Sequence, residues 1–194
     1  TLNAARYREI TRVGQLEDVL RGIDAAEAAG FSGIKINTVL IGGGNDGEIQ
    51  DIAALAEKKD RHVRFLELMP MGECASWDRE RFVDCSEVLR VLPGLVLEGI
   101  DGVEQRYRMP GWRGSIGLIR PVSAHFCPAC NRIRVTSLGM LKPCLHSAEE
   151  IPLRGLHGKE LEQAIREGIQ GKPRRHHLEA GKSGSLREMN EIGG

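Results

Sequence analysis

Helix and strand patterns alternate through the first 70 residues, and this alternation restricts the possible fold more than any other feature. Apolar residues recur at helical spacing over 16–23, and Gly30 stands where such a helix would end. A β-rich segment follows at 33–40, and a second one at 63–69 stops before Pro70. Alternating helices and strands are typical of an α/β protein in which helical crossovers join parallel strands.

The connection between these two β-rich segments contains a glycine run at 42–44. The run lacks the Lys-Ser/Thr ending of a phosphate-binding loop, so it predicts a turn. Asn45 follows the run with Glu48 three positions later, which is the pattern of a capping box, so we expect Asn45 to cap the next helix. The buried face of that helix would consist of Ile49, Ile52, Ala53 and Ala56.

The remaining sequence predicts shorter elements and a flexible tail. They are a helix over 86–92, β-like pieces around 95–97, 105–109 and 115–120, and a helix over 159–170. The tail from Lys172 is rich in Lys, Arg, His, Gly and Ser, and we expect its 174–177 stretch to be solvated. Two strands alone form no stable sheet, and Thr1 stands where an initiator Met would be, so we expect an N-terminal part to precede this sequence.

Composition excludes several classes of protein. Lys plus Arg and Asp plus Glu each total 27, so the basic excess of a general nucleic-acid binder is absent. Mean hydropathy is -0.27, and no apolar run is long enough to suggest a membrane protein. Five cysteines is an odd number, which favours reduced thiols in a cytoplasmic protein over a disulfide scaffold.

The most specific motif is a cysteine cluster formed by Cys127, Cys130 and Cys144. A C-x-x-C pair directs two sulfurs toward one metal centre, and a third cysteine returns later in the chain. One interpretation is a zinc site completed by His125 or His146. The other is a 4Fe–4S cluster, which normally has four cysteine ligands and would here keep one iron open. The spacing alone leaves both open, together with thiols that bind no metal.

Three cationic side chains near predicted strands are candidates for binding an anion. Side-chain alternation in a strand over 131–136 would place Arg132 and Arg134 on one face beside the cysteines. Two guanidinium groups there could bind a phosphate, although a solvated strand face is the commoner outcome. In an α/β barrel, Lys35 and Asn37 would face the lumen, where a buried lysine needs an anion as its partner. If their strand is instead an edge strand, Lys35 would face water.

These motifs stand in a recognisable order along the chain. The segments are 35–39, 45–46, 64–72, 121–127, 130–134 and 142–145, with Gly193-Gly194 at the end. In this order they resemble the GTP 3',8-cyclase family, radical S-adenosylmethionine enzymes that begin molybdenum cofactor biosynthesis. The resemblance covers essentially the whole chain.

The resemblance implies a fold and a domain organisation. We expect an α/β protein in which the later part of an incomplete TIM-like (β/α) barrel is followed by a β-rich C-terminal iron–sulfur region. Residues 1–72 would be the last barrel units, 73–171 the cluster- and GTP-binding region, and 172–194 a flexible tail ending in two glycines.

The resemblance also implies roles for individual residues. The ligands of a 4Fe–4S cluster whose open iron binds guanine would be Cys127, Cys130 and Cys144. The GTP-binding residues would be Lys35, Arg132, Ile133 and Arg134, and Met69 would contact S-adenosylmethionine. The residues needed for catalysis would be Arg132, Arg134, Gly193 and Gly194. Cys74 and Cys85 are expected to be ordinary buried or half-buried thiols.

The implied activity is a lyase reaction that converts GTP to (8S)-3',8-cyclo-7,8-dihydroguanosine 5'-triphosphate. A second 4Fe–4S cluster cleaves S-adenosylmethionine in this family, on a C-x3-C-x2-C motif that the sequence lacks. We therefore expect the chain to be the C-terminal part of such an enzyme and inactive alone. The product would pass to cyclic pyranopterin monophosphate synthase, and a homodimer is one possible assembly.

A rival hypothesis is a zinc-stabilised binding module. Its zinc would be held by the three clustered cysteines with His125 or His146, and Arg132 and Arg134 would contact the phosphates of a nucleic acid. The identity of the metal distinguishes the two hypotheses, because loss of a structural zinc ligand unfolds the segment that it holds.

Overall fold

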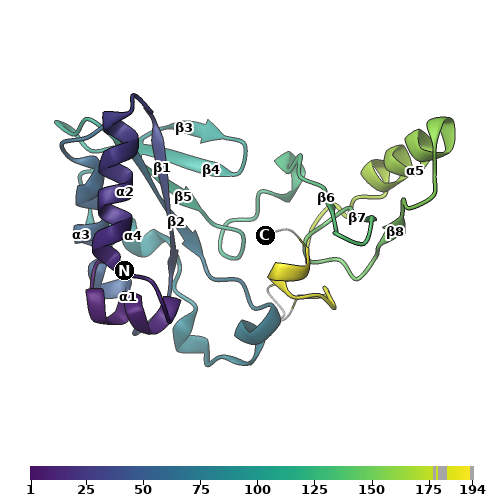
Figure 1. Cartoon of the computed structure of the whole chain (residues 1–194), viewed down its shortest axis with the longest axis horizontal. Helices are drawn as coiled ribbons and strands as arrows, with labels where there is room; N and C mark the ends of the chain where they lie inside the picture. The colour runs from purple at the N-terminus through teal and green to yellow at the C-terminus, as the bar shows by residue number, and fades with distance from the viewer. Residues whose placement is uncertain (177, 179–182, 193–194) are drawn as a thin grey trace. The chain divides into compact units, whose positions relative to one another are not determined.

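The fold was obtained as a computed structural model, which describes all residues except 177, 179–182 and 193–194 (Figure 1). Contacts within the chain divide it into two compact units. The sheet unit comprises Thr1–Leu68 and Arg79–Ser123, and the cysteine unit comprises Met69–Asp78 and Ala124–Gly194. The predicted boundaries after residues 72 and 171 stay a prediction.

The sheet unit contains a five-stranded mixed sheet in the order β1-β2-β5-β4-β3. Its strands are β1 (Ile34–Leu40), β2 (Arg61–Glu67), β3 (Val96–Asp101), β4 (Glu104–Arg108) and β5 (Ser115–Ile119). The first two pair in parallel, with Ile36 opposite Val63, and β5 adds a third parallel strand beside β2. The remaining two pair antiparallel. The α/β prediction is confirmed, whereas the incomplete barrel stays a prediction.

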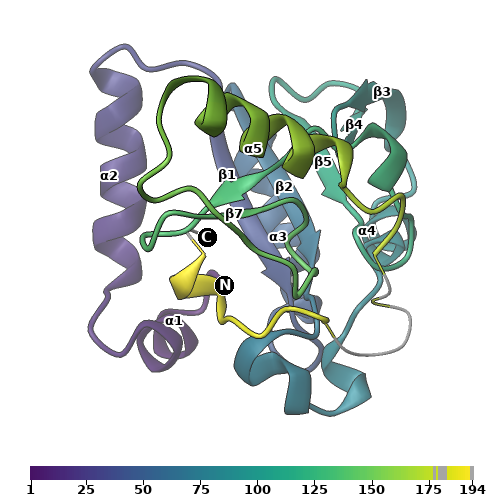
Figure 2. The ribbon, with the colours of Figure 1, turned by 90° about the vertical axis from the view of Figure 1, so that its right-hand side faces the viewer.

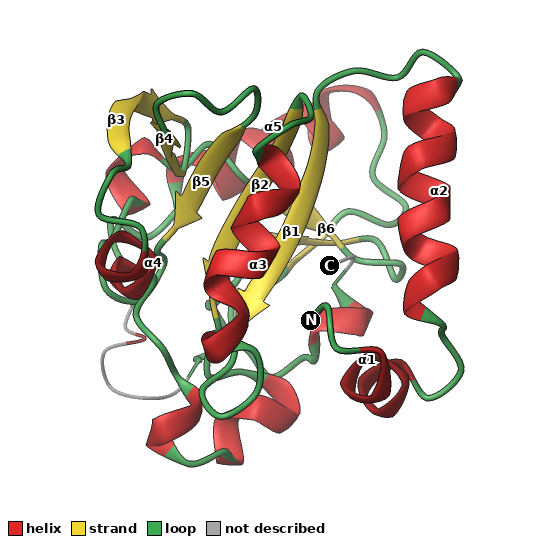
Figure 3. Cartoon of the chain, turned by 90° about the vertical axis from the view of Figure 1, so that its left-hand side faces the viewer, coloured by secondary structure: helices red, strands yellow, loops and turns green. Residues whose placement is uncertain are grey.

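Four α-helices accompany this sheet. They are α1 (Ala4–Thr11), α2 (Leu16–Ala28), α3 (Ile49–Ala53) and α4 (Ser86–Val91). Short 3-10 helices at Asp46–Glu48 and Ala54–Ala56 flank α3, and another spans Arg79–Arg81. Figure 3 shows α3 lying over β1 and β2. No helix among the described residues is both long and apolar enough to cross a membrane.

One face of the sheet forms the hydrophobic core. Val63 and Phe65 of β2 and Ile116 and Leu118 of β5 are fully buried there. The helices contribute the apolar residues that the sequence predicted at 49–56 together with Val88 and Leu92. Alternation explains this arrangement, because every second residue of a strand points to the same face. The opposite face carries polar and charged residues.

Asn45 occupies the N-cap position of the 3-10 helix at Asp46–Glu48, but the predicted capping by its side chain is wrong. The Asn45 side chain instead closes the turn after β1, since its Oδ1 accepts from Ile41 N at 2.9 Å and its Nδ2 donates to Val39 O at 2.9 Å. Glu48 does not reach back to Asn45. Its carboxylate accepts from Thr1 Oγ1 at 2.7 Å and pairs with Arg6.

All five strands of this sheet come from within the chain. Three of its strands lie between Val96 and Ile119, where the sequence predicted β-like pieces. The two predicted strands are therefore completed by later strands of the same chain, and the expected N-terminal part stays a prediction. At one side of the sheet, β1 is an edge strand among the described residues.

The described part of the cysteine unit contains a small three-stranded antiparallel sheet and one long helix. They are β6 (Arg134–Val135), β7 (Met140–Lys142), β8 (Ile151–Pro152) and α5 (Gly158–Gln170), with 3-10 helices at Gly72–Ser76, Cys127–Ala129 and Met189–Glu191. The predicted strand over 131–136 is thus reduced to two residues. One reason is that the Arg132 carbonyl accepts a hydrogen bond from Lys172 Nζ at 2.5 Å rather than from a neighbouring strand.

Helix α5 packs on the small sheet through Gly168 (Figure 2). A Cβ atom at Gly168 would collide with Leu141 Cδ2 and lie 3.0 Å from Ile151 Cδ1. Leu141 is fully buried, so it has little room to move. The absence of a side chain at position 168 is therefore what allows the close contact.

Gly168→Ala should destabilise the cysteine unit despite the better helix propensity of Ala. Propensity favours Ala by about 0.5–1 kcal/mol, whereas overpacking a core costs about 1–3 kcal/mol. Thermal unfolding is the measurement. Gly22→Ala in α2 is the matched control, because its new Cβ meets nothing within 4 Å and should raise stability. A Gly168→Ala protein as stable as the Gly22→Ala protein would contradict this packing.

An ion pair connects α2 to the start of β2. Arg61 Nε donates to Glu27 Oε1 at 2.6 Å, and Arg61 Nη2 donates to Asp24 at 2.7 Å. The hydrogen bond from Arg61 outweighs the opposing effect of burial and lowers the pKa of Glu27 from 4.5 to about 2. A lowered pKa in the folded state adds stability above the unfolded value, and this stability is lost as the pH falls toward the folded value.

Glu27→Gln should therefore unfold at lower urea concentration than the wild type at pH 7. The difference should shrink as the pH falls from 4.5 toward 2, because the wild-type carboxylate then loses its charge. Urea unfolding over this pH range is the measurement. If the two proteins differ in urea stability by the same amount at every pH, the charge of Glu27 does not contribute to stability.

Candidate functional site

The three predicted cluster ligands all belong to the cysteine unit. Cys127 begins a 3-10 helix, and Cys130 N donates to Cys127 O at 3.1 Å, so a tight turn brings the C-x-x-C pair together. Cys144 follows β7 and the buried Pro143. All three thiols are free and half-buried. Three thiols without a carboxylate are a donor set that suits an iron–sulfur cluster or zinc.

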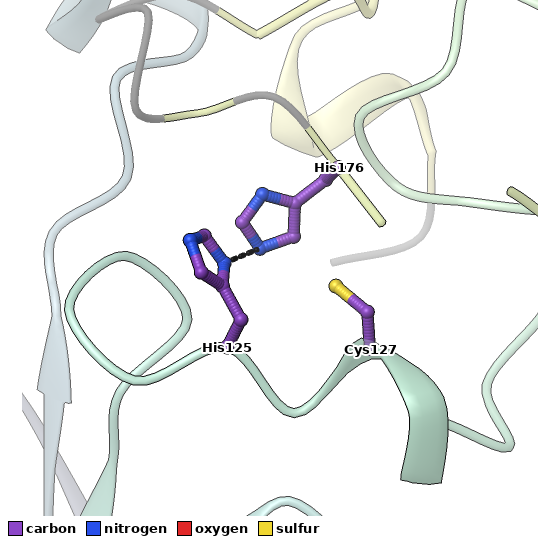
Figure 4. Close-up of side chains that lie close together, drawn as sticks. All are labelled: His125, Cys127 and His176. Carbon is purple, nitrogen blue, oxygen red and sulfur yellow. Dashed lines mark hydrogen bonds between the residues drawn. The ribbon is translucent and has the colours of Figure 1, made fainter. Parts of the chain in front are cut away.

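The closest set of potential ligands is different from the predicted one. Among the described residues, only His125, Cys127 and His176 form a set of three whose ligand atoms all lie within 4.8 Å of one another (Figure 4). The irons of a 4Fe–4S cluster occupy separate corners of a cube, so its thiolates stand farther apart than the ligands of one ion. The donor chemistry of the predicted trio thus fits a cluster, and its gathering around one stays a prediction.

A lysine accompanies the second cysteine of the motif. Lys172 Nζ lies 3.3 Å from Cys130 Sγ and donates to Arg132 O at 2.5 Å. The thiolate is the form of cysteine that binds metals, and a neighbouring ammonium group attracts it. Lys172 therefore connects the start of the basic tail to the cysteine motif, which the sequence reasoning did not anticipate.

Histidines surround the same region. His176 is 7% exposed, so the expectation of a solvated 174–177 stretch was wrong at this position, while His177 lies outside the described residues. The ring centroids of His146 and His176 are 5.1 Å apart. Burial and then the charges of His176, Lys142 and Arg134 lower the pKa of His146 to about 4, so this imidazole is neutral at pH 7.

A buried lysine supports the segment that carries Cys144. Lys142 is 1% exposed, and its Nζ donates to Ser147 O and lies 3.8 Å from Glu150. Glu150 also forms a bidentate ion pair with Arg187, at 2.5 and 2.7 Å. Burial lowers the pKa of Lys142. The lysine of the 142–144 motif therefore has a structural role, because it stabilises the loop that follows Cys144.

The arginine segment is accessible on this unit. Arg132 and Ile133 are exposed, and Arg134 is half-buried, with its Nη1 3.5 Å from Ile192 O. Arg132 precedes β6, so strand alternation does not determine its direction relative to Arg134. Met69 is half-buried just beyond the end of β2, and Gly193 and Gly194 lie outside the described residues. The proposed roles of these residues stay predictions.

Lys35 belongs to the sheet unit. It is exposed on the edge strand β1, beside Asn37, on the polar face of the sheet. Of the two predicted settings, the structure places Lys35 on an edge strand. Its role in binding GTP stays a prediction.

The polar face contains a hydrogen-bonded network that the sequence reasoning missed. His62 contacts Ser115 Oγ through Nδ1 at 2.7 Å and Glu104 through Nε2, and all three residues are buried. Glu104 also meets Arg64 at 3.4 Å, and Arg64 Nε donates to Asn37 at 2.8 Å. Burial acts to raise the pKa of Glu104, but the hydrogen bond from His62 and the charge of Arg64 lower it overall. The only signal in the sequence is alternation of His62 and Arg64 along one strand.

Glu67 joins two of the sequence motifs. Its buried carboxylate accepts from the backbone N–H groups of Val122 at 2.8 Å, Ser123 at 2.9 Å and Cys85 at 3.3 Å, and from the Ser123 hydroxyl. Burial and the charge of Glu67 raise the pKa of the Cys85 thiol, and burial raises that of Cys74. Cys85 is buried and Cys74 half-buried, as predicted for ordinary thiols.

Residues 61–178 match the protein family described as Molybdenum Cofactor Synthesis C. The chain belongs to this family. The relatives include proteins named GTP 3',8-cyclase from Alkaliphilus metalliredigens (strain QYMF), Peptoclostridium acidaminophilum and Alkaliphilus oremlandii (strain OhILAs), at 46%, 44% and 42% identity. These matches cover 100% of this chain and 62%, 61% and 62% of the relatives. The resemblance found in the motifs is confirmed, and the chain spans about 62% of the length of its first relative.

Glu67→Gln should destabilise the sheet unit. The amide nitrogen of Gln would face backbone N–H donors, and an unsatisfied buried polar group costs about 1–3 kcal/mol. Glu57→Gln is the control, since Glu57 is exposed. Urea unfolding should show a lower free energy of unfolding for Glu67→Gln and an unchanged one for Glu57→Gln. Equal stability of the two would contradict a structural role for Glu67.

Proposed function

We propose that this chain supplies the GTP-binding part of a GTP 3',8-cyclase in molybdenum cofactor biosynthesis. The observation that carries the proposal is one compact unit holding three free, half-buried cysteines and the Arg132–Arg134 segment, in a chain whose relatives are named GTP 3',8-cyclase. The chain would correspond to the C-terminal part of such an enzyme, with residues 1–72 as barrel units, 73–171 as the cluster- and GTP-binding region and 172–194 as the tail.

Cys127, Cys130 and Cys144 would hold a 4Fe–4S cluster. With only three protein ligands, the bound cluster would supply one open iron to which the guanine base can bind. The protein's own contribution is to present three thiolates, and Lys172 supports this role through its position 3.3 Å from Cys130 Sγ.

The triphosphate would be bound by cationic groups. Arg132 is exposed and Arg134 half-buried, and guanidinium groups bind phosphate oxygens bidentately. Ile133, exposed between them, would contact the same nucleotide, and exposed Lys35 would add another positive charge. Met69 would contact S-adenosylmethionine, and Gly193-Gly194 would complete the catalytic set with the two arginines.

The complete reaction needs more than this chain contains. The sequence has no C-x3-C-x2-C motif for the cluster that cleaves S-adenosylmethionine, so the chain alone would be inactive. Release of 5'-deoxyadenosine by the isolated, reconstituted chain would contradict this. In the complete lyase, the product would pass to cyclic pyranopterin monophosphate synthase. A cytoplasmic location and a homodimer remain part of the proposal.

The cluster assignment is tested by anaerobic reconstitution with iron and sulfide. We expect about four irons per chain, as one 4Fe–4S cluster requires. Cys144→Ser should lose most of this iron, whereas Cys74→Ser, which changes another half-buried thiol of the same unit, should keep it. Iron retained by Cys144→Ser at the wild-type level would contradict the assignment.

The phosphate assignment is tested by GTP binding to the reconstituted chain. Arg132→Ala should weaken binding by about tenfold or more, since a hydrogen bond to a charged group contributes about 1.5–3 kcal/mol. Guanosine, which lacks the phosphates, should bind both proteins equally. Arg154→Ala, another exposed arginine of the cysteine unit, is the control. Unchanged GTP affinity in Arg132→Ala would remove this residue from the site.

A further inference from the structure

His125, Cys127 and His176 form a compact set of potential metal ligands, called here the His–Cys–His set. Their ligand atoms lie within 4.8 Å of one another, and His125 Nδ1 is 3.3 Å from His176 Nε2. The ring centroids of the two histidines are 4.6 Å apart, with an angle of 62° between the planes. In Figure 4 the Cys127 sulfur points toward the two rings. All three residues belong to the cysteine unit.

The chemistry of this set suits one zinc ion. Zinc in proteins prefers imidazole nitrogen and thiolate sulfur in a tetrahedral arrangement, and three protein ligands leave the fourth position for water or another ligand. His176 is buried and the other two are half-buried, so the ligands are partly shielded from solvent. The set contains no carboxylate, which argues against magnesium or calcium.

The set differs from the proposed cluster ligands in two of its three members. Cys127 belongs to both, whereas His125 and His176 belong only to the His–Cys–His set, and Cys130 and Cys144 belong only to the cysteine trio. When Cys127 is a terminal ligand of one centre, the other centre lacks its third protein ligand. Occupation of one centre therefore competes with occupation of the other.

We propose that, when no cluster is bound, His125, Cys127 and His176 bind a single zinc ion, which blocks cluster assembly by occupying Cys127. The zinc site itself stands independently of the proposed function, and only the competition with cluster assembly rests on it.

The metal site is tested on the metal-free chain with Co²⁺ as a spectroscopic probe for zinc, under anaerobic conditions. We expect one Co²⁺ per chain, absorption bands typical of tetrahedral coordination with a thiolate, and displacement by Zn²⁺. His176→Ala and, separately, His125→Ala should weaken Co²⁺ binding by at least about tenfold, since even outer-shell partners of metals are worth about 10- to 100-fold. Circular dichroism checks that each variant is folded.

The controls separate this site from the cysteine trio. Cys144→Ser should bind Co²⁺ like the wild type but lose iron on reconstitution, whereas folded His176→Ala should lose Co²⁺ and keep iron. His157→Ala removes an exposed histidine of the same unit and should change neither. Zinc added before reconstitution should reduce iron uptake by the wild type and leave that of His176→Ala unaffected.

The outcomes distinguish the two proposals. Equal loss of Co²⁺ in Cys144→Ser and His176→Ala would mean that the trio and a histidine form the metal site, and wild-type Co²⁺ affinity in both histidine variants would remove the His–Cys–His set from metal binding. Either result overturns the inference. Tight Co²⁺ binding that depends on the two histidines, in a protein that takes up no iron, would support the zinc site and contradict the proposed cluster.

Discussion

The buried carboxylate of Glu67 is the interaction on which the sheet unit most depends. A buried carboxylate is stable only when its oxygens are hydrogen-bonded, and Glu67 accepts from the backbone of Val122, Ser123 and Cys85. Glu67 is the last residue of β2. The two segments of the sheet unit end at the next residue, Leu68, and at Ser123. One side chain therefore connects the end of β2 to the segment that follows β5, and the chain continues into the cysteine unit after each of them.

The two faces of the sheet follow from the alternation of side chains, and they explain what could be predicted from the sequence. Apolar periodicity correctly indicated the parallel pair, the buried face of α3 and the α5 helix, because these patterns are local. The side-chain partners of Asn45 and His176 were not predictable, since they depend on contacts with residues that local patterns do not identify: a turn takes the Asn45 amide, and packing in the cysteine unit buries His176. The network of His62, Glu104 and Arg64 was missed for the same reason.

The cysteine unit combines two donor sets that share one thiol. Spacing alone left zinc and iron–sulfur open. The structure brings together the ligand atoms of the His–Cys–His set, whereas the gathering of the three cysteines around a cluster stays a prediction. If both proposals hold, their overlap at Cys127 would make the choice of metal a competition. The relatives are named GTP 3',8-cyclase, and under the proposed function the cluster would be the functional state.

The central claim is that the three cysteines hold a cluster whose open iron binds the guanine base. The most direct test is electron paramagnetic resonance of the reduced, reconstituted chain with GTP that carries ¹⁵N in the guanine ring. The account predicts that GTP changes the cluster signal and that a ¹⁵N coupling from the base is detected. A cluster signal that is identical with and without GTP, with no ¹⁵N coupling, would contradict it.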